Sequence, residues 1–306
     1  MPLPAGGPLA ISHIRDMPVL PQLPEGAVVR RFSCREAAVG WPAAIAIPAK
    51  QEAATVTDCL SAVAGSIGRS PLPAGIVLAV NDSADRTYAL AGSWLAERRL
   101  PHVVLDVELP AGRGSAGVAR RLALDVAAAL VAPDGLLLTT DADSRPHSDW
   151  VAQNLAAIAA GADVVCGEID IDAADWALLP SRVRCRILLE RAYAGLTTRF
   201  DSLLDPSAPG PATRQRNASG ASIACRQAVY RDVGGMPPIA CGEDRAFAAA
   251  AAGRGWRVRH APDVRVTTSG RLTGRARGGM ADTLASWVGD QAAACDQAMK
   301  PASVAP

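Results

Sequence analysis

The sequence predicts a three-layer α/β/α fold with a mostly parallel central sheet. Short apolar runs alternate along the chain with stretches of helical periodicity, the pattern of strands joined by crossover helices. The chain has 306 residues, of which 49% are hydrophobic, so it can bury a sizeable core. Two aspartates closely follow the apolar run at 136–138. Because ligands of open α/β sheets bind outside the carboxyl ends of the strands, we expect a functional site there.

The first half of the chain follows this alternation closely. Val56, Leu60 and Val63 share one face of a helix, and the glycines at 112, 114 and 117 precede another. Such glycines can hold a phosphate, but their spacing is not that of a Walker loop. We expect strands at 43–47, 76–80, 102–107 and from 136 onward, and helices at 55–64, 88–99 and 118–131.

The second half is less regular. Between 182 and 191, four arginines lie among apolar residues; a helix there would present them to an anionic partner or to solvent, and the pattern favours solvent. We expect helices at 147–160, 247–252 and 281–299, strands at 163–167, 221–225, 256–260 and 264–268, and a Pro/Gly loop at 205–211. The predicted organisation is an N-terminal arm or irregular extension at 1–40, one domain at 41–280, and a C-terminal helix and tail at 281–306.

Bulk properties argue against several classes of protein. The net charge is +1, so no strong field attracts nucleic acid. No run of about 18 apolar residues predicts a membrane span, and the first 20 residues lack the apolar core of a signal peptide. The seven cysteines are scattered without a Cys-x-x-Cys pair, which favours thiols in a reducing compartment. We therefore expect a soluble, cytoplasmic protein.

Asp141 and Asp143 form the first acidic pair, after the strand that begins at Leu136. Two carboxylates at this position suit a hard cation, because Mg²⁺ is usually held by one or two carboxylates together with substrate phosphates. The alternative is a polar strand-to-loop turn, where aspartate is common.

Glu243 and Asp244 form the second acidic pair, at the start of an alanine-rich helix. Acids at a helix N-terminus can satisfy free amide groups and the helix dipole. That role explains one carboxylate better than it explains two.

Several short motifs together resemble the family 2 glycosyltransferases, enzymes of the GT-A fold. The resemblance covers about residues 43–270 and depends on the order and spacing of the motifs. The opening motif, Ile-Pro-Ala-Lys-Gln-Glu, is similar to the family's Ile-Pro-Ala-Tyr-Asn-Glu, and later ones resemble its Gly-x-Ala-Arg and Asp-x-Asp elements. In chain order the motifs are Ile47–Glu52, Val80–Thr87, Gly117–Arg120, Asp141–Asp143, Gly220–Arg226, Gly234–Gly235 and Gly242–Asp244.

The resemblance implies a GT-A-type fold with a nucleotide-binding N-terminal half and an acceptor-binding C-terminal half. It implies a nucleotide-diphospho-sugar donor, a carbohydrate or other hydroxyl acceptor, a Mg²⁺ or Mn²⁺ ion, and inversion at the anomeric carbon. Asp143 would bind the cation with Asp141 beside it, and Asp244 would be the general base. Glu52 and Asp82 would lie at the nucleoside, and further substrate contacts would come from Pro48, Ala49, Arg120, Gly220, Glu243 and Arg271.

The sequence also departs from the family pattern. Lys50-Gln51 replaces the Tyr-Asn of the opening motif, and Arg121 stands where asparagine is usual. Thr267–Ser269 occupies the place of a histidine that often binds the metal, so Arg271 and Arg275 are candidates to share the charge of the diphosphate. The Gln-x-x-Arg-Trp element of processive synthases is absent, which favours transfer of a single sugar.

Two other functions are compatible with parts of the pattern. A sugar-1-phosphate nucleotidylyltransferase also has a doubly wound sheet, but it would need a Gly-rich basic loop after the first strand, which residues 48–52 lack. A catalytically silent relative that binds a nucleotide-sugar or a partner protein would not need both acidic pairs.

Overall fold

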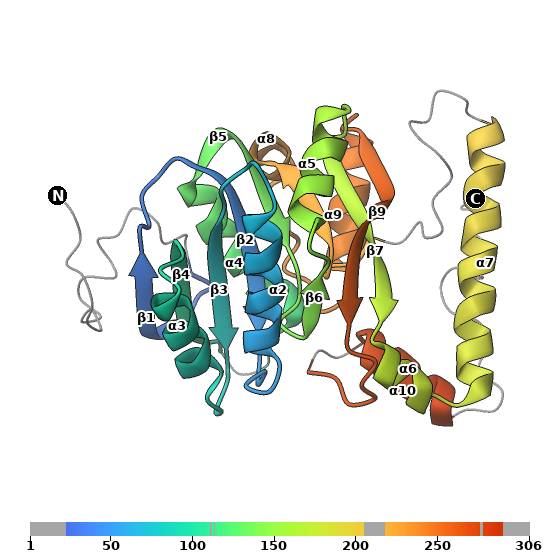
Figure 1. Cartoon of the computed structure of the whole chain (residues 1–306), viewed down its shortest axis with the longest axis horizontal. Coiled ribbons are helices and arrows are strands. Elements are labelled where there is room, and N and C mark those ends of the chain that lie inside the picture. Colours follow the sequence, from blue (N-terminus) through green and yellow to red (C-terminus); the bar gives the residue numbers. More distant parts are fainter. Residues whose placement is uncertain (1–22, 111, 113, 205–217, 276–277, 290–306) are drawn as a thin grey trace.

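One mixed sheet of nine strands forms the centre of the part of the protein that the structure describes (Figure 1). This structure is a computed structural model and describes residues 23–110, 112, 114–204, 218–275 and 278–289. The strands are β1 Val28–Arg35, β2 Trp41–Ala49, β3 Gly75–Asn81, β4 His102–Glu108, β5 Val131–Thr139, β6 Ser144–Pro146, β7 Val164–Ile171, β8 Ile223–Arg226 and β9 Val258–Thr268. Across the sheet their order is β1-β4-β3-β2-β5-β8-β7-β9-β6.

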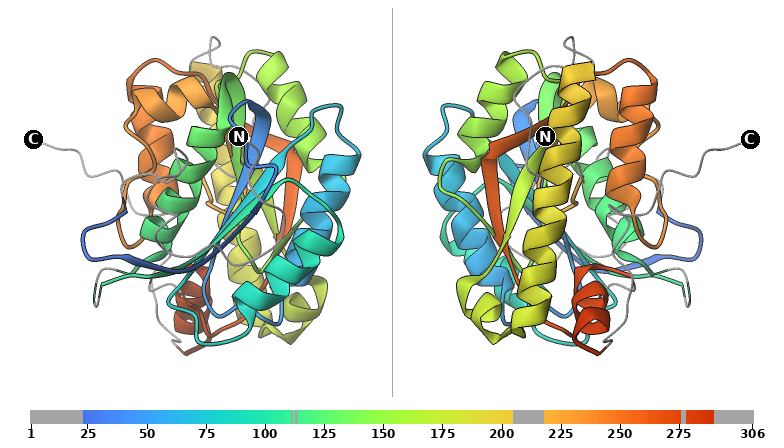
Figure 2. Two further views of the ribbon diagram at one scale, coloured as in Figure 1. Left: turned by 90° about the vertical axis from the view of Figure 1, so that its left-hand side faces the viewer. Right: turned by 90° about the vertical axis from the view of Figure 1, so that its right-hand side faces the viewer.

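Helices cover both faces of this sheet (Figure 2). They are α2 Val56–Gly68, α3 Thr87–Glu97, α4 Ala116–Leu130, α5 Trp150–Ala159, α6 Ala173–Leu178, α7 Ser181–Leu204, α8 Gln227–Asp232, α9 Glu243–Gly253 and α10 Met280–Gly289. One apolar cluster joins α2, α3 and α5 to the sheet, and a second joins α4, α8 and α9 to its other face. The predicted three-layer α/β/α fold is therefore confirmed.

Strand direction places the site at one edge of the sheet. β4, β3, β2 and β5 run parallel to one another, whereas β8 is antiparallel to both β5 and β7. β9 is parallel to β7, so six strands share a direction and end at the same edge of the sheet. Only β1, β6 and β8 among the described strands run the other way.

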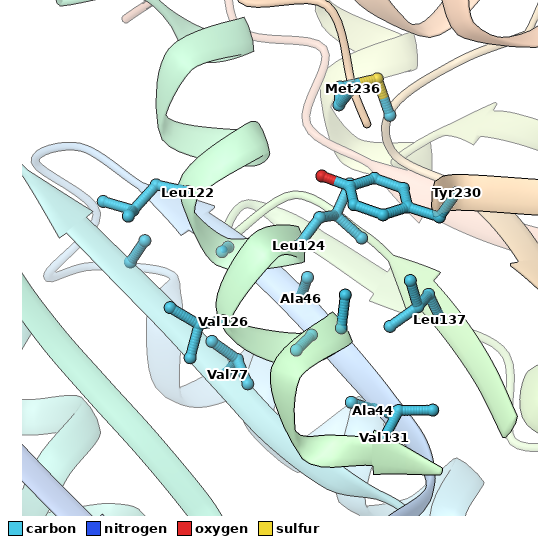
Figure 3. Close-up of a cluster of buried hydrophobic side chains, with 14 of the residues drawn as sticks. Ala44, Ala46, Val77, Leu122, Leu124, Val126, Val131, Leu137, Tyr230 and Met236 are labelled. Atoms are coloured by element: carbon cyan, nitrogen blue, oxygen red, sulfur yellow. The ribbon is translucent and has the colours of Figure 1, made fainter. Parts of the chain in front are cut away.

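The core around α4 shows why this helix packs where it does. Leu122, Val126 and Leu130 recur every four residues and are buried on one face of the helix. Figure 3 shows Val126 in one cluster with Ala46 of β2 and Leu137 of β5. The small side chains of β2 allow the helix to pack closely on the sheet, which fixes the start of α4 beside the carboxyl ends of β2 and β5.

Two expectations about strands were wrong. Residues 28–35 lie in the predicted irregular extension, yet they form β1, the edge strand paired with β4. Asp106 is fully buried in β4 and pairs with Arg30 and Arg31 at 2.7 and 2.6 Å, which ties this polar segment to the sheet. The two strands predicted at 256–260 and 264–268 are one strand, β9, which begins only at Val258, since the register shift against β7 accommodates Pro262 without ending the strand.

Other differences concern short elements. β6 and α6 have weak sequence patterns and were not expected. The predicted helix 281–299 is described as α10 up to Gly289, and the predicted loop 205–211 lies outside the described residues. α7 packs at its N-terminal end against α10 through Val183, Ile187, Leu284 and Trp287. No helix among the described residues is long and apolar enough to cross a membrane.

Candidate active site

A cavity of about 1350 Å³ lies at the carboxyl ends of the parallel strands. Asp143 and Asp244, which are about a hundred residues apart in sequence, both line it. Single-ligand pockets measure about 300–1,000 Å³, so this cavity is larger than a typical site for one small ligand. Of the residues that the sequence singled out, it brings together Pro48, Ala49, Glu52, Arg120, Asp141, Asp143, Gly220, Glu243, Asp244 and Arg271.

The first acidic pair lies in the turn that follows β5. The Ser144 N–H donates to the carbonyl of Asp141 at 3.0 Å, and this closes the turn. Asp143 is largely buried, and its pKa is raised from 3.8 to about 6. Burial is the main cause, the charges of Asp141 and Glu52 add to it, and Arg271 opposes it.

Arg271 lies between two carboxylates of the cavity. Its guanidinium donates to Glu52 Oε1 at 2.6 Å and to Glu52 Oε2 at 2.9 Å. The same group lies 2.9 Å from Asp143 Oδ2. The hydrogen bonds to Glu52, followed by the charge of Asp143, outweigh the effect of burial and raise the pKa of Arg271. Arg271 therefore joins the loop after β2 to the turn after β5.

The loop after β2 is held by its neighbour after β3. The Glu52 N–H donates to Thr87 Oγ1 at 2.8 Å, and the Gln51 N–H donates to Ser83 Oγ at 2.9 Å. Gln51 and Asp82 both have a positive φ, which is uncommon for residues other than glycine. Such backbone strain is typical of functional sites and is maintained by surrounding contacts of this kind.

Asp82 is the one predicted site residue outside the lining of the cavity. Its carboxylate accepts a hydrogen bond from the Leu109 N–H at 2.8 Å and lies 3.7 Å from the Lys50 ammonium. In the described conformation this carboxylate therefore fixes the loops after β3 and β4. Its neighbour Asn81 and the residue Lys50 do line the cavity.

Arg120 connects the two acidic pairs. Its guanidinium donates to Asp141 Oδ1 at 2.8 Å and to Glu243 Oε1 at 3.0 Å, as well as to Thr139 Oγ1 and the carbonyl of Gly220. Only 4% of Arg120 is exposed. Burial lowers the pKa of Arg120, but the charges of Asp141 and Glu243 raise it by more, so the net shift is upward. Gly220 is required here, since a Cβ at this position would lie 2.3 Å from the guanidinium.

One hydrogen bond of the second acidic pair serves the N-terminus of α9, and its other bonds reach outside the helix. Gly242 is the N-cap of α9, with a φ of +79° and no side chain to cap the helix. Glu243 binds Arg120 instead. Asp244 accepts hydrogen bonds from the Gly220 N–H at 2.8 Å and from its neighbour, the Arg245 N–H, at 2.7 Å. These contacts turn the Asp244 carboxylate toward the loop before β8 and into the cavity wall.

The oxygen donors suit a divalent cation that arrives with a diphosphate. No three His, Cys, Asp or Glu side chains form a metal-binding group within the described ranges of the chain. Mg²⁺ does not need such a group when substrate phosphates complete its coordination, and one or two carboxylates then suffice. Asp141 and Asp143 would provide that pair, and Glu52 lies close enough to raise the pKa of Asp143.

Sequence reasoning missed two residues. Asp175 of α6 fixes residues 269–270 through its carboxylate, and nothing in the sequence pattern indicated this. Arg245 also lines the cavity, directly after Asp244. Its position directly after Asp244, the predicted general base, is the sequence feature that indicates it.

The chain's family follows from comparison with known proteins. The sequence model of the family described as "Glycosyl transferase family 2" matches residues 44–211, more than half of the chain. The chain belongs to this family. As a family 2 glycosyltransferase it is an enzyme, and the nucleotidylyltransferase alternative has no support. The match includes Glu52, Asp141 and Asp143, whereas Asp244 lies beyond it.

Solved structures show the same fold. S. aureus TarS (residues 1–349) is similar with a TM-score of 0.50 and 17% identity, covering 74% of this chain and 60% of that chain. The mannosyltransferase PcManGT from Pyrobaculum calidifontis, in complex with GDP-Man and Mn²⁺, is similar with a TM-score of 0.52 and 18% identity, covering 79% of this chain and 60% of that chain. This chain thus spans about 60% of the length of each. No curated protein matched it. These similarities support the GT-A fold.

Proposed function

We propose that this family 2 glycosyltransferase moves one sugar from a nucleotide-diphospho-sugar to a hydroxyl acceptor, with inversion at the anomeric carbon and a divalent cation. The observation that carries the proposal is the shared cavity, into which the first acidic pair projects from the donor half and Asp244 from the acceptor half. The mannosyltransferase of similar fold was solved with GDP-Man and Mn²⁺, which supports the same classes of donor and metal for this chain.

Asp143, with Asp141 beside it, would hold Mg²⁺ or Mn²⁺ against the diphosphate. The bound cation offsets the negative charge that develops on the leaving nucleoside diphosphate. Arg271 adds a second positive group at the same place, because its guanidinium already lies 2.9 Å from Asp143. Its planar fork of donors matches a phosphate as well as a carboxylate.

Asp244 would take the proton of the acceptor hydroxyl. An alcohol is a weak nucleophile, so a carboxylate within hydrogen-bond reach must accept its proton as the new glycosidic bond forms. The two backbone N–H groups that bind Asp244 keep the carboxylate oriented without neutralising it. Arg120 holds the adjacent Glu243, so the start of α9 is fixed relative to the turn after β5.

The test is turnover by the Asp244→Asn variant. Wild-type protein is first screened with nucleotide-diphospho-sugars and Mn²⁺ for release of nucleoside diphosphate, with and without alcohol acceptors. Since positioned proton transfer contributes about 10²–10⁴-fold, Asp244→Asn should lose turnover by about that factor. Wild-type turnover in the variant would show that the base is another residue. Absence of release from every donor would contradict the proposed reaction.

A further inference from the structure

A short segment crosses the cavity from the end of β9 to the end of β2. We call residues Thr268–Arg275 the strap. Its first part is fixed by Asp175, whose carboxylate accepts hydrogen bonds from Ser269 Oγ at 3.0 Å and from the Gly270 N–H at 2.7 Å. Its last part is fixed by the Arg275 guanidinium, which donates to the carbonyl of Gln51 at 3.0 and 3.2 Å. Arg271 lies between these two anchors.

The strap holds Arg271 on the oxygen atoms that the proposed cation would use. Glu52 binds the guanidinium through both carboxylate oxygens, at 2.6 and 2.9 Å. Asp143 then lies at 2.9 Å from the same guanidinium through Oδ2. Glu52 is 5% exposed, so its carboxylate is shielded from water and from salt, whereas 26% of the Arg271 side chain is exposed. The guanidinium therefore remains at Asp143 when no ligand is bound.

A divalent cation on Asp143 would place two like charges side by side. The cation carries +2, Arg271 carries +1, and both would use the Asp143 carboxylate. We propose that Arg271 is a tethered cation that competes with the divalent metal for Asp143, and that Glu52 is its anchor. This inference rests on the proposed role of Asp143 as a metal ligand.

The competition determines the order of binding. A cation alone must displace Arg271 from Asp143, whereas a donor diphosphate brings negative charge that accommodates both positive groups. The guanidinium of Arg271 can then turn from the Asp143 carboxylate to a phosphate, because its paired N–H donors bind either group. The enzyme would therefore bind cation weakly without nucleotide and tightly with it.

The experiment measures Mn²⁺ affinity without nucleotide, by the electron paramagnetic resonance signal of free Mn²⁺. The Arg271→Gln variant should bind Mn²⁺ about tenfold more tightly than wild type, because the competing charge is gone. Arg271→Lys should lie between the two, since it keeps the charge but cannot bridge both carboxylates. Arg98→Gln is the control: it removes the same charge from an exposed residue at the end of α3, outside the cavity lining, so affinity should stay within about twofold.

The double variant Arg271→Gln with Asp143→Asn locates the effect. The double variant is compared with Asp143→Asn alone. If Arg271→Gln gives no gain in Mn²⁺ affinity in that background, the competition is at Asp143, and if the gain persists there, the inference is wrong. Equal or weaker Mn²⁺ binding by Arg271→Gln also overturns it and leaves the proposed transfer reaction standing. Absence of Mn²⁺ binding by wild type and Arg271→Gln alike, with or without nucleoside diphosphate, would overturn both this inference and the cation requirement of the proposed function.

Discussion

At the scale of single residues, the site is a balance of buried carboxylates and arginines. Asp141 and Glu243 share Arg120, while Glu52 and Asp143 share Arg271. A buried charge that loses its partner destabilises a protein strongly, so these pairs also hold the two halves of the cavity in position. The raised pKa of Asp143 shows that Arg271 does not fully offset the burial of this carboxylate and the charges beside it. This is the property expected of a group that awaits a cation.

Asp143→Asn should therefore stabilise the ligand-free protein at high pH. The pKa of Asp143 is about 6 in the folded state and 3.8 ordinarily, so the folded protein holds this proton more tightly than the unfolded chain. Ionisation of Asp143 thus destabilises the fold as pH rises from about 4 to about 6, by roughly 1.4 kcal/mol per unit of pKa shift. With chelator present, the variant's free energy of unfolding at pH 8 should exceed that of wild type by about 1–3 kcal/mol, and the difference should shrink toward pH 4.

Urea unfolding at several pH values measures this difference. Asp134→Asn is the control, because Asp134 is exposed in β5, where the pairing with β2 shifts register, and should change stability by less than about 0.5 kcal/mol at any pH. A variant at Asp143 that is no more stable than wild type at pH 8 would contradict the assigned environment of this carboxylate.

At the scale of elements, the site depends on where strands end and helices begin. α4 starts at the carboxyl ends of β2 and β5 with Ser115 as its N-cap, whose side chain accepts a hydrogen bond from the Val118 N–H. Gly117 in its first turn packs directly on the backbone before α9, since a Cβ there would lie 2.2 Å from the Ile239 carbonyl oxygen. Helix α4 and the loop before α9 therefore touch at a position that only glycine fits.

Gly117→Ala should separate these two elements. Because the clash is with backbone, we expect a loss of about 1–3 kcal/mol in the free energy of unfolding. Gly65→Ala in α2 is the matched control: a Cβ there meets nothing within 4 Å, and replacing an exposed helical glycine should stabilise by up to about 1 kcal/mol. Thermal unfolding of both variants measures the contrast, and a Gly117→Ala protein as stable as Gly65→Ala would refute the close packing.

At the scale of the whole molecule, local sequence patterns predict the elements that they form, but they do not predict contacts between residues far apart in the sequence. Strands such as β2 and β3 were predictable because their residues are mostly apolar and buried on both faces, and β5 was predictable only from Leu136 onward, where its buried leucines begin. β1 was not, because its arginines are paired by Asp106, more than 70 residues away. The acidic pairs were found through motif order, but the Arg271–Glu52 pair spans 219 residues and leaves no local pattern.

The two acidic pairs lie in one cavity, and the central claim is that they have different tasks there. Isothermal titration of a nucleoside diphosphate with Mn²⁺, tested with both UDP and GDP, measures this most directly in wild type, Asp143→Asn and Asp244→Asn. We predict that Asp244→Asn binds nucleotide and Mn²⁺ as wild type does, while Asp143→Asn loses the Mn²⁺-dependent part of the affinity. Unchanged Mn²⁺-dependent binding in Asp143→Asn, or its loss in Asp244→Asn, would contradict the assignment.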